Sequence, residues 1–521
     1  MARAEPLGQV PRPTVFWIGL SMILAGIVEF FVEYLRAAPR HFRMADLPMT
    51  EIRWASMAMI VAGLVTGACG LIPRNAPGPP RVARDALALG ANPASLRRRM
   101  MTALSFALFV DQLKPATLAF IVPGMRAEYH LTTAQVAFLP MVALGGNVVG
   151  SLLWGHLADR IGRRAAVLLA AILFVATSIN AAMPTFTDNL IVSAFMGLSA
   201  GGMLPTVYAL TSEVVPRRGS GVLVLQAGLI AVAAYLCASG LAAVVVPFAG
   251  WRILWFVQLP FPLVLIAANR WIPESPAFLE AAGKVVEGRL LAHRLGVVVG
   301  ERSVLERRQN ASVLFRPGYL TQTLVISLYA LAWGTVNWGF LTFLPAVLGQ
   351  SALGMPVAQL LFVSSLLSIP GTALAAWLYS RWSSRRTMAL YATLTAGALF
   401  ALAVVPIDGN PLGVAVVLVA LLTGSSAVVA VIGPYTAQIY PAACRGFGSG
   451  LAAGCGKSGG LFGPPIIASL LTVLSIGGVA AVVAVPLVVA AVAVAVWGRE
   501  VTRTVHVVET QEAPERVAAG V

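Results

Sequence analysis

Charged residues are scarce in this sequence, since Asp, Glu, Lys and Arg together make up only 11% of its 521 residues. Soluble domains carry roughly 25% charged residues, and a chain of this length would form several such domains, each with a polar surface. The charges here are too few to cover those surfaces, and 58% of the residues are hydrophobic. This composition excludes an ordinary cytosolic enzyme and a disordered protein. It indicates an integral membrane protein.

Cysteine and lysine are rare as well. The four cysteines lie in or beside apolar runs without metal-ligand spacing, which excludes a disulfide scaffold and favours packed apolar side chains. Of the 36 basic residues only three are lysines, and the other 33 are arginines. The net charge of +15 would suggest nucleic-acid binding in a soluble chain, but in a membrane chain it more often marks cytoplasmic loops. We therefore expect no nucleic-acid partner.

Long apolar runs account for most of the chain. A membrane helix needs about 20 apolar residues, and the sequence contains fourteen such runs. Two lie near the N-terminus, at about 15–35 and 54–73. The other twelve lie at about 101–124, 133–156, 165–185, 189–211, 221–247, 252–272, 319–348, 357–380, 386–406, 411–438, 446–473 and 476–498.

The longest polar stretch separates the sixth and seventh of these twelve core runs. This spacing predicts an all-α integral membrane fold with two six-helix bundles, hence twelve core transmembrane helices, and an extra N-terminal hairpin of two helices. The predicted parts are an N-terminal extension (1–100), a first bundle (101–272), a cytoplasmic connector (273–318), a second bundle (319–498) and a cytoplasmic tail (499–521).

Arginine indicates the orientation of these helices. Loops on the side of the connector hold the runs 97–99, 163–164 and 385–386, whereas the opposite core loops hold little besides Arg126 and Arg252. By the positive-inside rule we expect a multi-pass protein of the cell membrane with both termini in the cytoplasm. The first two runs fit less well, because the arginines between them would face outside. They form either an added hairpin, which we favour, or partly interfacial helices.

The two bundles echo each other in sequence. GHLADRIGRR follows the second core run and ends at Arg164, and WLYSRWSSRR follows the eighth and ends at Arg386, 222 residues later. SEVVPRRGSG and AQIYPAACRGFGSG end the fourth and tenth runs, with their prolines 225 residues apart. Two echoes at nearly one spacing indicate a duplicated six-helix unit. Parallel repeats with a site between them at the midplane are a transporter architecture.

Several motifs resemble the major facilitator superfamily (MFS). The pattern G-x-L-a-D-R-x-G-R-R begins at Gly155 and resembles that family's loop between the second and third helices. PESPAFLEAAGKVVEGR from Pro273, E-x-x-P-x-x-x-G from Glu213 and G-x-x-N…P from Gly334 are similar to the sugar-porter branch and its organic-acid and niacin-transporting relatives. The resemblance covers about residues 101–500. It implies the MFS fold and transport by alternating access.

The resemblance also implies that the loop around Asp159 closes the cytoplasmic side. A carboxylate there can accept hydrogen bonds from a helix N-terminus, and Arg163 or Arg164 can pair with acids such as Glu213 or Glu274. Contacts that form in one state and break in the other bias a two-state equilibrium. The predicted gate consists of Gly155, Asp159, Arg160, Gly162, Arg163, Arg164, Glu213, Arg217, Glu274, Arg385, Arg386 and Arg445.

Charges inside the predicted spans are few, costly and usually functional. Asp111 is the only acid well inside a core span, and the cations there are Lys114 and Lys457. Asp111 either binds a proton with its affinity tuned by Lys114, or forms a structural pair with Lys114 three residues along the same helix face. The two lysines could also bind an anionic substrate. No histidine lies in mid-membrane, so proton coupling would depend on Asp111.

Polar and aromatic side chains within spans supply the remaining substrate-binding candidates, although each is individually more often packing. GCGKSGG around Lys457 resembles a phosphate-binding loop, but Leu451 occupies the position of its first glycine and no soluble domain surrounds it. We therefore exclude ATP binding. The candidates are Asn147, Gln226, Tyr329, Trp333 and Asn337, of which Asn337 is favoured because the resemblance also includes it.

These features together predict a transporter and not an enzyme. It moves a small organic solute, with a carboxylate or other anion favoured, by alternating access and proton-coupled symport. The alternatives are efflux of a metabolite or drug by proton antiport and a transporter-like receptor that binds without transport. We expect no metal or cofactor. The expected partners are the substrate, protons and the lipid bilayer, and a monomer is expected to suffice.

Overall fold

The computed structural model describes residues 11–45, 47–72, 93–214, 220–281, 284–295, 314–349, 355–407, 410–440 and 445–500. Within these residues every regular element is a helix, as the composition predicts. Twelve of the described helices are long and apolar enough to span a membrane, and two of them are the N-terminal pair. The predicted spans 189–211 and 446–473, which are not among the twelve, correspond to helices of 29 and 26 residues.

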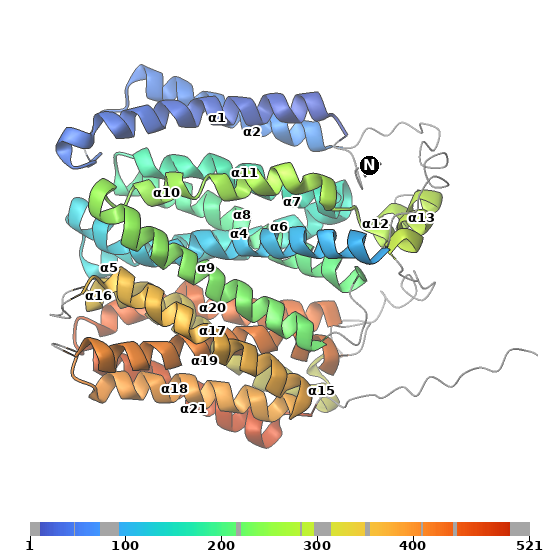
Figure 1. Ribbon diagram of the computed structural model, residues 1–521, viewed down its shortest axis with the longest axis vertical. Helices are drawn as coiled ribbons and strands as arrows, with labels where there is room; N and C mark the ends of the chain where they lie inside the picture. Colours follow the sequence, from blue (N-terminus) through green and yellow to red (C-terminus); the bar gives the residue numbers. More distant parts are fainter. Residues whose placement is uncertain are drawn as a thin grey trace, which may run out of the picture.

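The N-terminal half forms one group of parallel and antiparallel helices, and the connector carries two short ones (Figure 1). The half comprises α4 (Pro93–Glu128), α5 (Thr133–Val136), α6 (Phe138–Ile161), α7 (Arg163–Ala176), η3 (Thr177–Ala182), α8 (Phe186–Val214), α9 (Ser220–Ala249), α10 (Ile253–Val257), α11 (Pro260–Ala267) and η4 (Ala268–Trp271). The connector helices are α12 (Pro276–Ala281) and α13 (Val285–Leu295).

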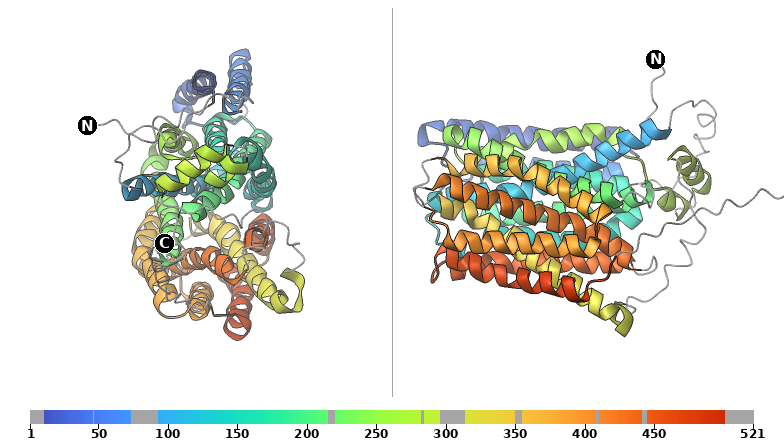
Figure 2. Two further views of the ribbon diagram at one scale, coloured as in Figure 1. Left: turned by 90° about the vertical axis from the view of Figure 1, so that its right-hand side faces the viewer. Right: turned by 60° about the horizontal axis from the view of Figure 1, so that its bottom comes forward.

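The C-terminal half forms a second group that lies against the first (Figures 1 and 2). It comprises α15 (Pro317–Gly334), the π-helical segment η7 (Thr335–Phe340), α16 (Leu341–Leu348), α17 (Val357–Arg381), α18 (Ser384–Val404), α19 (Pro411–Ile439), α20 (Arg445–Leu470) and α21 (Ile476–Trp497). The halves meet where α17 and α19 pack on α9, α20 on α6, and α16 on α4. A site between the halves is therefore surrounded by α4, α6, α9 and α20.

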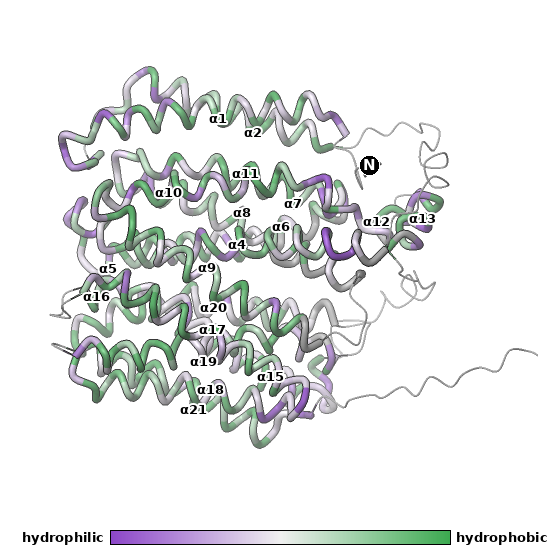
Figure 3. Tube along the Cα trace, viewed as in Figure 1, coloured by the Kyte–Doolittle hydropathy of each residue, from purple (hydrophilic) through white to green (hydrophobic). Residues whose placement is uncertain are grey.

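The bundle has two distinct ends, along which hydrophilic residues gather (Figure 3). We call the end that carries α12 and α13 the connector end, and the opposite end the far end (Figure 1). Apolar side chains such as Phe248, Val404 and Trp377 are exposed along the sides between them. A lipid bilayer would cover this apolar surface, which is too extensive for a soluble monomer.

Glycine allows the closest helix contacts in each half. In the N-terminal half a Cβ atom on Gly197 of α8 would lie 1.7 Å from the carbonyl oxygen of Ala143 on α6. In the C-terminal half a Cβ atom on Gly459 of α20 would lie 2.3 Å from the carbonyl oxygen of Leu331 on α15. Small residues at such contacts let membrane helices approach closely. The glycines of GCGKSGG are thus a helix-packing surface, which agrees with excluding ATP binding.

The N-terminal segment forms an antiparallel hairpin alongside the core helices (Figures 1 and 2). It comprises α1 (Pro13–Arg36), η1 (Ala38–Arg40) and α2 (Glu51–Leu71), and it packs on α7 and η3. Arg53 of α2 is 1% exposed and donates a 2.7 Å hydrogen bond to the carbonyl oxygen of Ala182 at the end of η3. The loop between α1 and α2 lies at the far end. The segment is therefore arranged as the predicted hairpin, and not as interfacial helices.

Candidate functional site

The one acid predicted inside a core span faces the other half of the molecule. Asp111 of α4 is 2% exposed, and Lys457 of α20 is the cation whose charge acts on it. Gln112 donates a 3.0 Å hydrogen bond to Asp111 Oδ2, while Oδ1 has no hydrogen-bond partner among the described residues. Pro115 has no N–H to donate to the carbonyl of Asp111. The carboxyl group thus lies in a dry, polar gap between the halves.

Lys457 also bridges the halves directly. Its Nζ donates to the hydroxyl of Ser151 on α6, and Ser151 in turn donates a 2.8 Å hydrogen bond to the carbonyl oxygen of Asn147. The amide oxygen of Asn147 is buried without a described partner. An acid and an amide from the N-terminal half therefore lie near a cation from the C-terminal half. We call Asp111, Asn147, Ser151 and Lys457 the central site.

Lys114 does not belong to the central site. It is 2% exposed, and its Nζ donates to the carbonyl of Phe174, to Thr177 Oγ1 at 3.0 Å and to Ser178 Oγ at 3.5 Å. These acceptors lie where α7 changes to the tighter η3, a transition that frees backbone carbonyls. The structural pair of Asp111 with Lys114 is therefore wrong, because the long lysine side chain reaches into the N-terminal half instead.

The C-terminal half brings aromatic and amide groups towards the middle of the molecule. Asn337 lies in the π-helical segment η7, and Ser425 of α19 donates a 3.1 Å hydrogen bond to its side-chain oxygen. Trp333 Nε1 donates a 3.0 Å hydrogen bond to the backbone oxygen of the same serine. Its ring meets that of Trp338 edge to face, with centroids 6.3 Å apart. Single π-helical turns occur often at functional sites.

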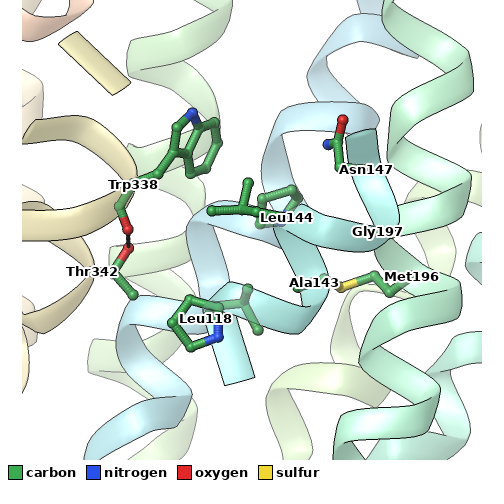
Figure 4. Close-up of a pocket in the computed structure, with 10 residues that line it drawn as sticks. Leu118, Ala143, Leu144, Asn147, Met196, Gly197, Trp338 and Thr342 are labelled. Carbon is green, nitrogen blue, oxygen red and sulfur yellow. Dashed lines mark hydrogen bonds between the residues drawn. The ribbon is translucent and has the colours of Figure 1, made fainter. Parts of the chain in front are cut away.

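A small cavity lies between the halves beside these groups. Figure 4 shows Trp338 and Thr342 of the C-terminal half facing Leu144 and Asn147 of the N-terminal half. The cavity measures about 10 Å³, which holds about one water molecule. Substrate binding in it would therefore require the two halves to separate.

Two further candidates hold helices together within one half. Gln226 of α9 donates to the hydroxyl of Ser105 on α4. Tyr329 of α15 is fully buried and donates a 3.1 Å hydrogen bond to the carbonyl oxygen of Met388 on α18. Of the predicted substrate-binding residues, the structure thus gathers Asn147, Trp333, Asn337 and Lys457 around the contact between the halves. It places Lys114, Gln226 and Tyr329 in helix-packing contacts.

At the connector end a glutamate caps a core helix. Glu274 Oε1 accepts hydrogen bonds from the backbone N–H groups of Arg163 and Arg164, at 2.7 and 3.4 Å, in the first turn of α7. Gly162, with φ of 101°, precedes this turn, and a Cβ atom there would lie 2.4 Å from Glu274 Oε2. Burial raises the pKa of Glu274 above its usual value, although the hydrogen bonds from these N–H groups and from Ser275 oppose the rise.

The arginine side chains at this cap bind neutral partners. Arg163 Nη1 donates a 2.9 Å hydrogen bond to Ser275 Oγ, and Arg164 Nη2 donates to the side-chain oxygen of Asn269. Arg160 is exposed. Gly155, Asp159, Glu213 and Arg445 lie on α6, α8 and α20, but their side chains lie outside the described part, as does all of Arg217. The predicted gating by Asp159 therefore stays a prediction.

The C-terminal half repeats this cap with a residue that the sequence interpretation assigned to the tail. Glu500 Oε1 accepts a 2.8 Å hydrogen bond from the backbone N–H of Ser384 in the first turn of α18, and Oε2 accepts one from Ser383 Oγ at 2.6 Å. Arg385 and Arg386 lie in the same turn. Burial would raise the pKa of Glu500, but the hydrogen bonds from both serines outweigh it and lower the pKa. Glu500 follows Glu274 by 226 residues, close to the repeat spacing, which was the available signal.

Comparison with known proteins decides the family. Residues 104–464 match the family model of the Major Facilitator Superfamily. The chain belongs to this superfamily. The niacin transporter NiaP of Acinetobacter baylyi is 26% identical over 377 residues, which cover 69% of this chain and 84% of NiaP. The 4-hydroxybenzoate transporter PcaK of Pseudomonas putida is 27% identical over 383 residues, which cover 70% of this chain and 84% of PcaK.

The solved structures agree with this assignment to the MFS. The xylose transporter XylE from E. coli superposes with a TM-score of 0.64 at 16% identity, covering 78% of this chain and 98% of XylE. The predicted fold class and the resemblance to the sugar-porter branch and its niacin-transporting relatives are confirmed. This MFS protein is a membrane transporter of small organic solutes and not an enzyme.

A network at the far end of this MFS fold was not predicted from the sequence. Glu128 at the end of α4 is 5% exposed, and Arg252 is 1% exposed. They form a 2.9 Å ion pair. Arg252 also donates to the carbonyl oxygens of Ala181 and Met183, at 2.9 and 3.0 Å. Buried ion pairs persist when hydrogen bonds satisfy their remaining groups.

The same carboxylate fixes the hairpin to the core. Glu128 Oε1 accepts hydrogen bonds from the backbone N–H groups of Met44 and Ala45, at 2.7 and 3.0 Å. Trp251 Nε1 donates a 2.8 Å hydrogen bond to Oε2. The segment before the family match is therefore joined to the MFS core by specific contacts.

Proposed function

We propose that this MFS protein takes up a small aromatic carboxylate together with a proton. The observation that carries the proposal is the central site, where Asp111 and Lys457 act on each other from opposite halves. Asp111 is buried with one unpaired oxygen. Buried ionisable groups in membrane proteins commonly serve as proton and substrate sites.

The groups around Lys457 support an aromatic anion. Its ammonium group is a point charge suited to a carboxylate, and Trp333, Trp338 and Asn337 lie on the same half nearby. Flat apolar surfaces with few polar groups suit small organic ligands. Two relatives are named for niacin and 4-hydroxybenzoate, which are both small aromatic carboxylates.

The charges provide a coupling mechanism. When Asp111 takes a proton, Lys457 loses its counter-charge and becomes available to the substrate carboxylate. The loaded site then carries no uncompensated charge, so the halves can exchange access at low cost. After the substrate and proton leave, the attraction between Asp111 and Lys457 restores a neutral empty site. A site loaded with substrate alone would carry one net charge, which disfavours movement across the bilayer.

We place the connector end in the cytoplasm, and therefore both chain termini as well. Arg97, Arg98 and Arg99 begin α4 at that end, and Arg163, Arg164, Arg385 and Arg386 begin α7 and α18 there. Positive charge of this kind is retained on the cytoplasmic side of a cell membrane. The far end, with the α1–α2 loop, then faces outside, and each half contacts the other within one chain, so a monomer suffices.

Flux measurements on the reconstituted full chain test this function. Proteoliposomes with an inward pH gradient would be offered 4-hydroxybenzoate, nicotinate and the neutral amide of each acid. We expect uphill uptake of at least one acid, none of either amide, and loss of accumulation when a protonophore collapses the gradient. One pH unit supplies about 1.4 kcal/mol per proton, enough for roughly tenfold accumulation.

Other outcomes identify the alternatives. Acid leaving the vesicles against its gradient in exchange for protons would show antiport and overturn symport. Saturable binding without exchange of labelled for unlabelled acid would indicate a receptor. Equal transport of acids and amides would remove the role given to Lys457.

A further inference from the structure

A second cavity, of about 380 Å³, lies at the far end. Sites for small ligands measure about 300–1,000 Å³, so this cavity has the size that the central cavity lacks. Three parts of the chain line it: His41, Phe42 and Arg43 from the α1–α2 loop, Phe120, Glu128 and Trp251 from the N-terminal half, and Pro345, Val357 and Ala358 from the C-terminal half, among others. It therefore lies where the two halves and the hairpin meet.

The lining combines aromatic surface with positive charge. Phe42 and Trp251 supply aromatic side chains, and Arg43 is an exposed cation on the same loop. The acid in the lining, Glu128, is already neutralised by Arg252 and accepts hydrogen bonds from Trp251 and the loop backbone. The cavity thus offers a ligand an aromatic wall and one cation, because its carboxylate is engaged elsewhere. This chemistry suits an aromatic carboxylate.

The loop holds this shape in an unfavourable backbone conformation. His41 and Phe42 are consecutive non-glycine residues in the left-handed region, with φ of 53° and 58°, which L-residues rarely adopt. Surrounding contacts maintain it: Phe42 donates a 3.0 Å backbone hydrogen bond to Ala37, and its ring stacks on Tyr34 with centroids 4.9 Å apart. Such strain persists where the surroundings fix it, often at ligand sites.

We infer that the far-end cavity is a second binding site for the transported anion, completed by the N-terminal hairpin. An aromatic ring packs against Phe42 and Trp251, and its carboxylate binds Arg43 before the solute reaches the central site. The inference rests on the proposed substrate class. It gives the hairpin a function in capturing substrate at the outer face.

Equilibrium binding of 4-hydroxybenzoate to the purified full chain tests the site. Lys457→Met removes the central cation, so the binding that remains in this variant reports the far-end cavity. Adding Arg43→Ala should weaken that remaining binding at least tenfold, about the effect of losing one charge-assisted hydrogen bond. The matched control is Arg40→Ala, which removes the same charge from the same exposed loop outside the cavity lining. We expect it to leave the remaining binding unchanged.

Transport and a neutral probe separate the outcomes. In the otherwise unchanged chain, Arg43→Ala should raise KM with little change in kcat, and 4-hydroxybenzamide should bind Lys457→Met more weakly than the acid does. No binding to Lys457→Met, or binding that Arg43→Ala leaves unchanged, overturns the far-end site even if uphill uptake proves the proposed function. If uptake fails for every acid but Arg43-dependent binding persists, the proposed function falls and the far-end site stands.

Discussion

The N-terminal and C-terminal halves share one plan but differ where charge is buried. At the connector end each half uses a glutamate, Glu274 or Glu500, to accept hydrogen bonds from the first turn of its third helix. In the core the halves differ, because one contributes Asp111 and the other Lys457. The comparison teaches that repetition built the scaffold and divergence built the central site.

The two caps also differ in their surroundings. Glu274 is half-buried and its burial raises its pKa, whereas Glu500 is exposed and its hydrogen bonds to serines lower its pKa. The same contact therefore favours a protonated acid in one half and an ionised acid in the other. Four predictions test how far this difference between the halves extends.

The largest expected effect comes from removing the core acid of the N-terminal half. Asp111→Asn should abolish uphill uptake, because the amide cannot bind and release a proton. Accumulation driven by one pH unit should fall by about tenfold, to the level without a gradient. Exchange of labelled for unlabelled acid should continue. Unchanged uphill uptake would remove Asp111 from the mechanism.

A double-mutant cycle tests whether the core charges of the two halves depend on each other. Lys457→Met alone leaves Asp111 without its counter-charge, and adding Asp111→Asn should recover part of the lost stability. We expect a coupling free energy of about 0.5–3 kcal/mol from thermal unfolding in detergent. Lys114→Met is the matched control, because Lys114 donates to Phe174, Thr177 and Ser178 and not to Asp111. Additive effects at positions 111 and 457 would contradict the pairing.

The caps should contribute unequally to stability. Glu274→Gln loses charged hydrogen bonds in a half-buried position and should cost about 1–2 kcal/mol, as strong helix caps do. Glu500→Gln acts at an exposed cap and should cost about 0.5 kcal/mol. Melting temperatures at neutral pH would give this order. Equal losses would mean that the two caps are equivalent despite their different exposure.

The smallest effect should appear in the pH dependence of stability. The raised pKa of Glu274 means that the folded state binds more protons than the unfolded state, so this group adds stability as pH falls towards its usual pKa. Glu500 has a lowered pKa and loses stability as pH falls through the same window. Between about pH 6 and pH 4, Glu500→Gln should therefore lessen the loss of stability on acidification and Glu274→Gln should deepen it. Parallel curves for both variants would contradict the opposite shifts.

The sequence was sufficient for the fold but only partly for the site. Apolar runs located the helices, because lipid requires about 20 apolar residues per span, and the echoes ending at Arg164 and Arg386 identified the repeat. Asp111 and Lys457 stood out as rare charges. Their approach across the halves could not be predicted, because it depends on how the bundles pack.

The errors and omissions have similar physical causes. Lys114 was assigned to Asp111 by helical spacing, but its side chain follows the carbonyl groups freed at the start of η3. Glu500 was assigned to the tail, since nothing local distinguishes it. The role of Glu128 depends on a loop more than 80 residues earlier in the chain. Each depends on a tertiary contact that neither composition nor spacing contains.

The N-terminal hairpin changes what kind of helix α7 is. Nearly all residues from Arg163 to Ala182 are buried, and many in α7 are alanines. A Cβ atom on Gly67 of α2 would lie only 3.0 Å from the side chain of Ile172. A chain trimmed to the family-matched region would expose this smooth, small-residue face to lipid, along with the cavity rim that holds Arg43. The hairpin is therefore an integral wall of the protein, and the boundary of the family match is not a safe place to cut it.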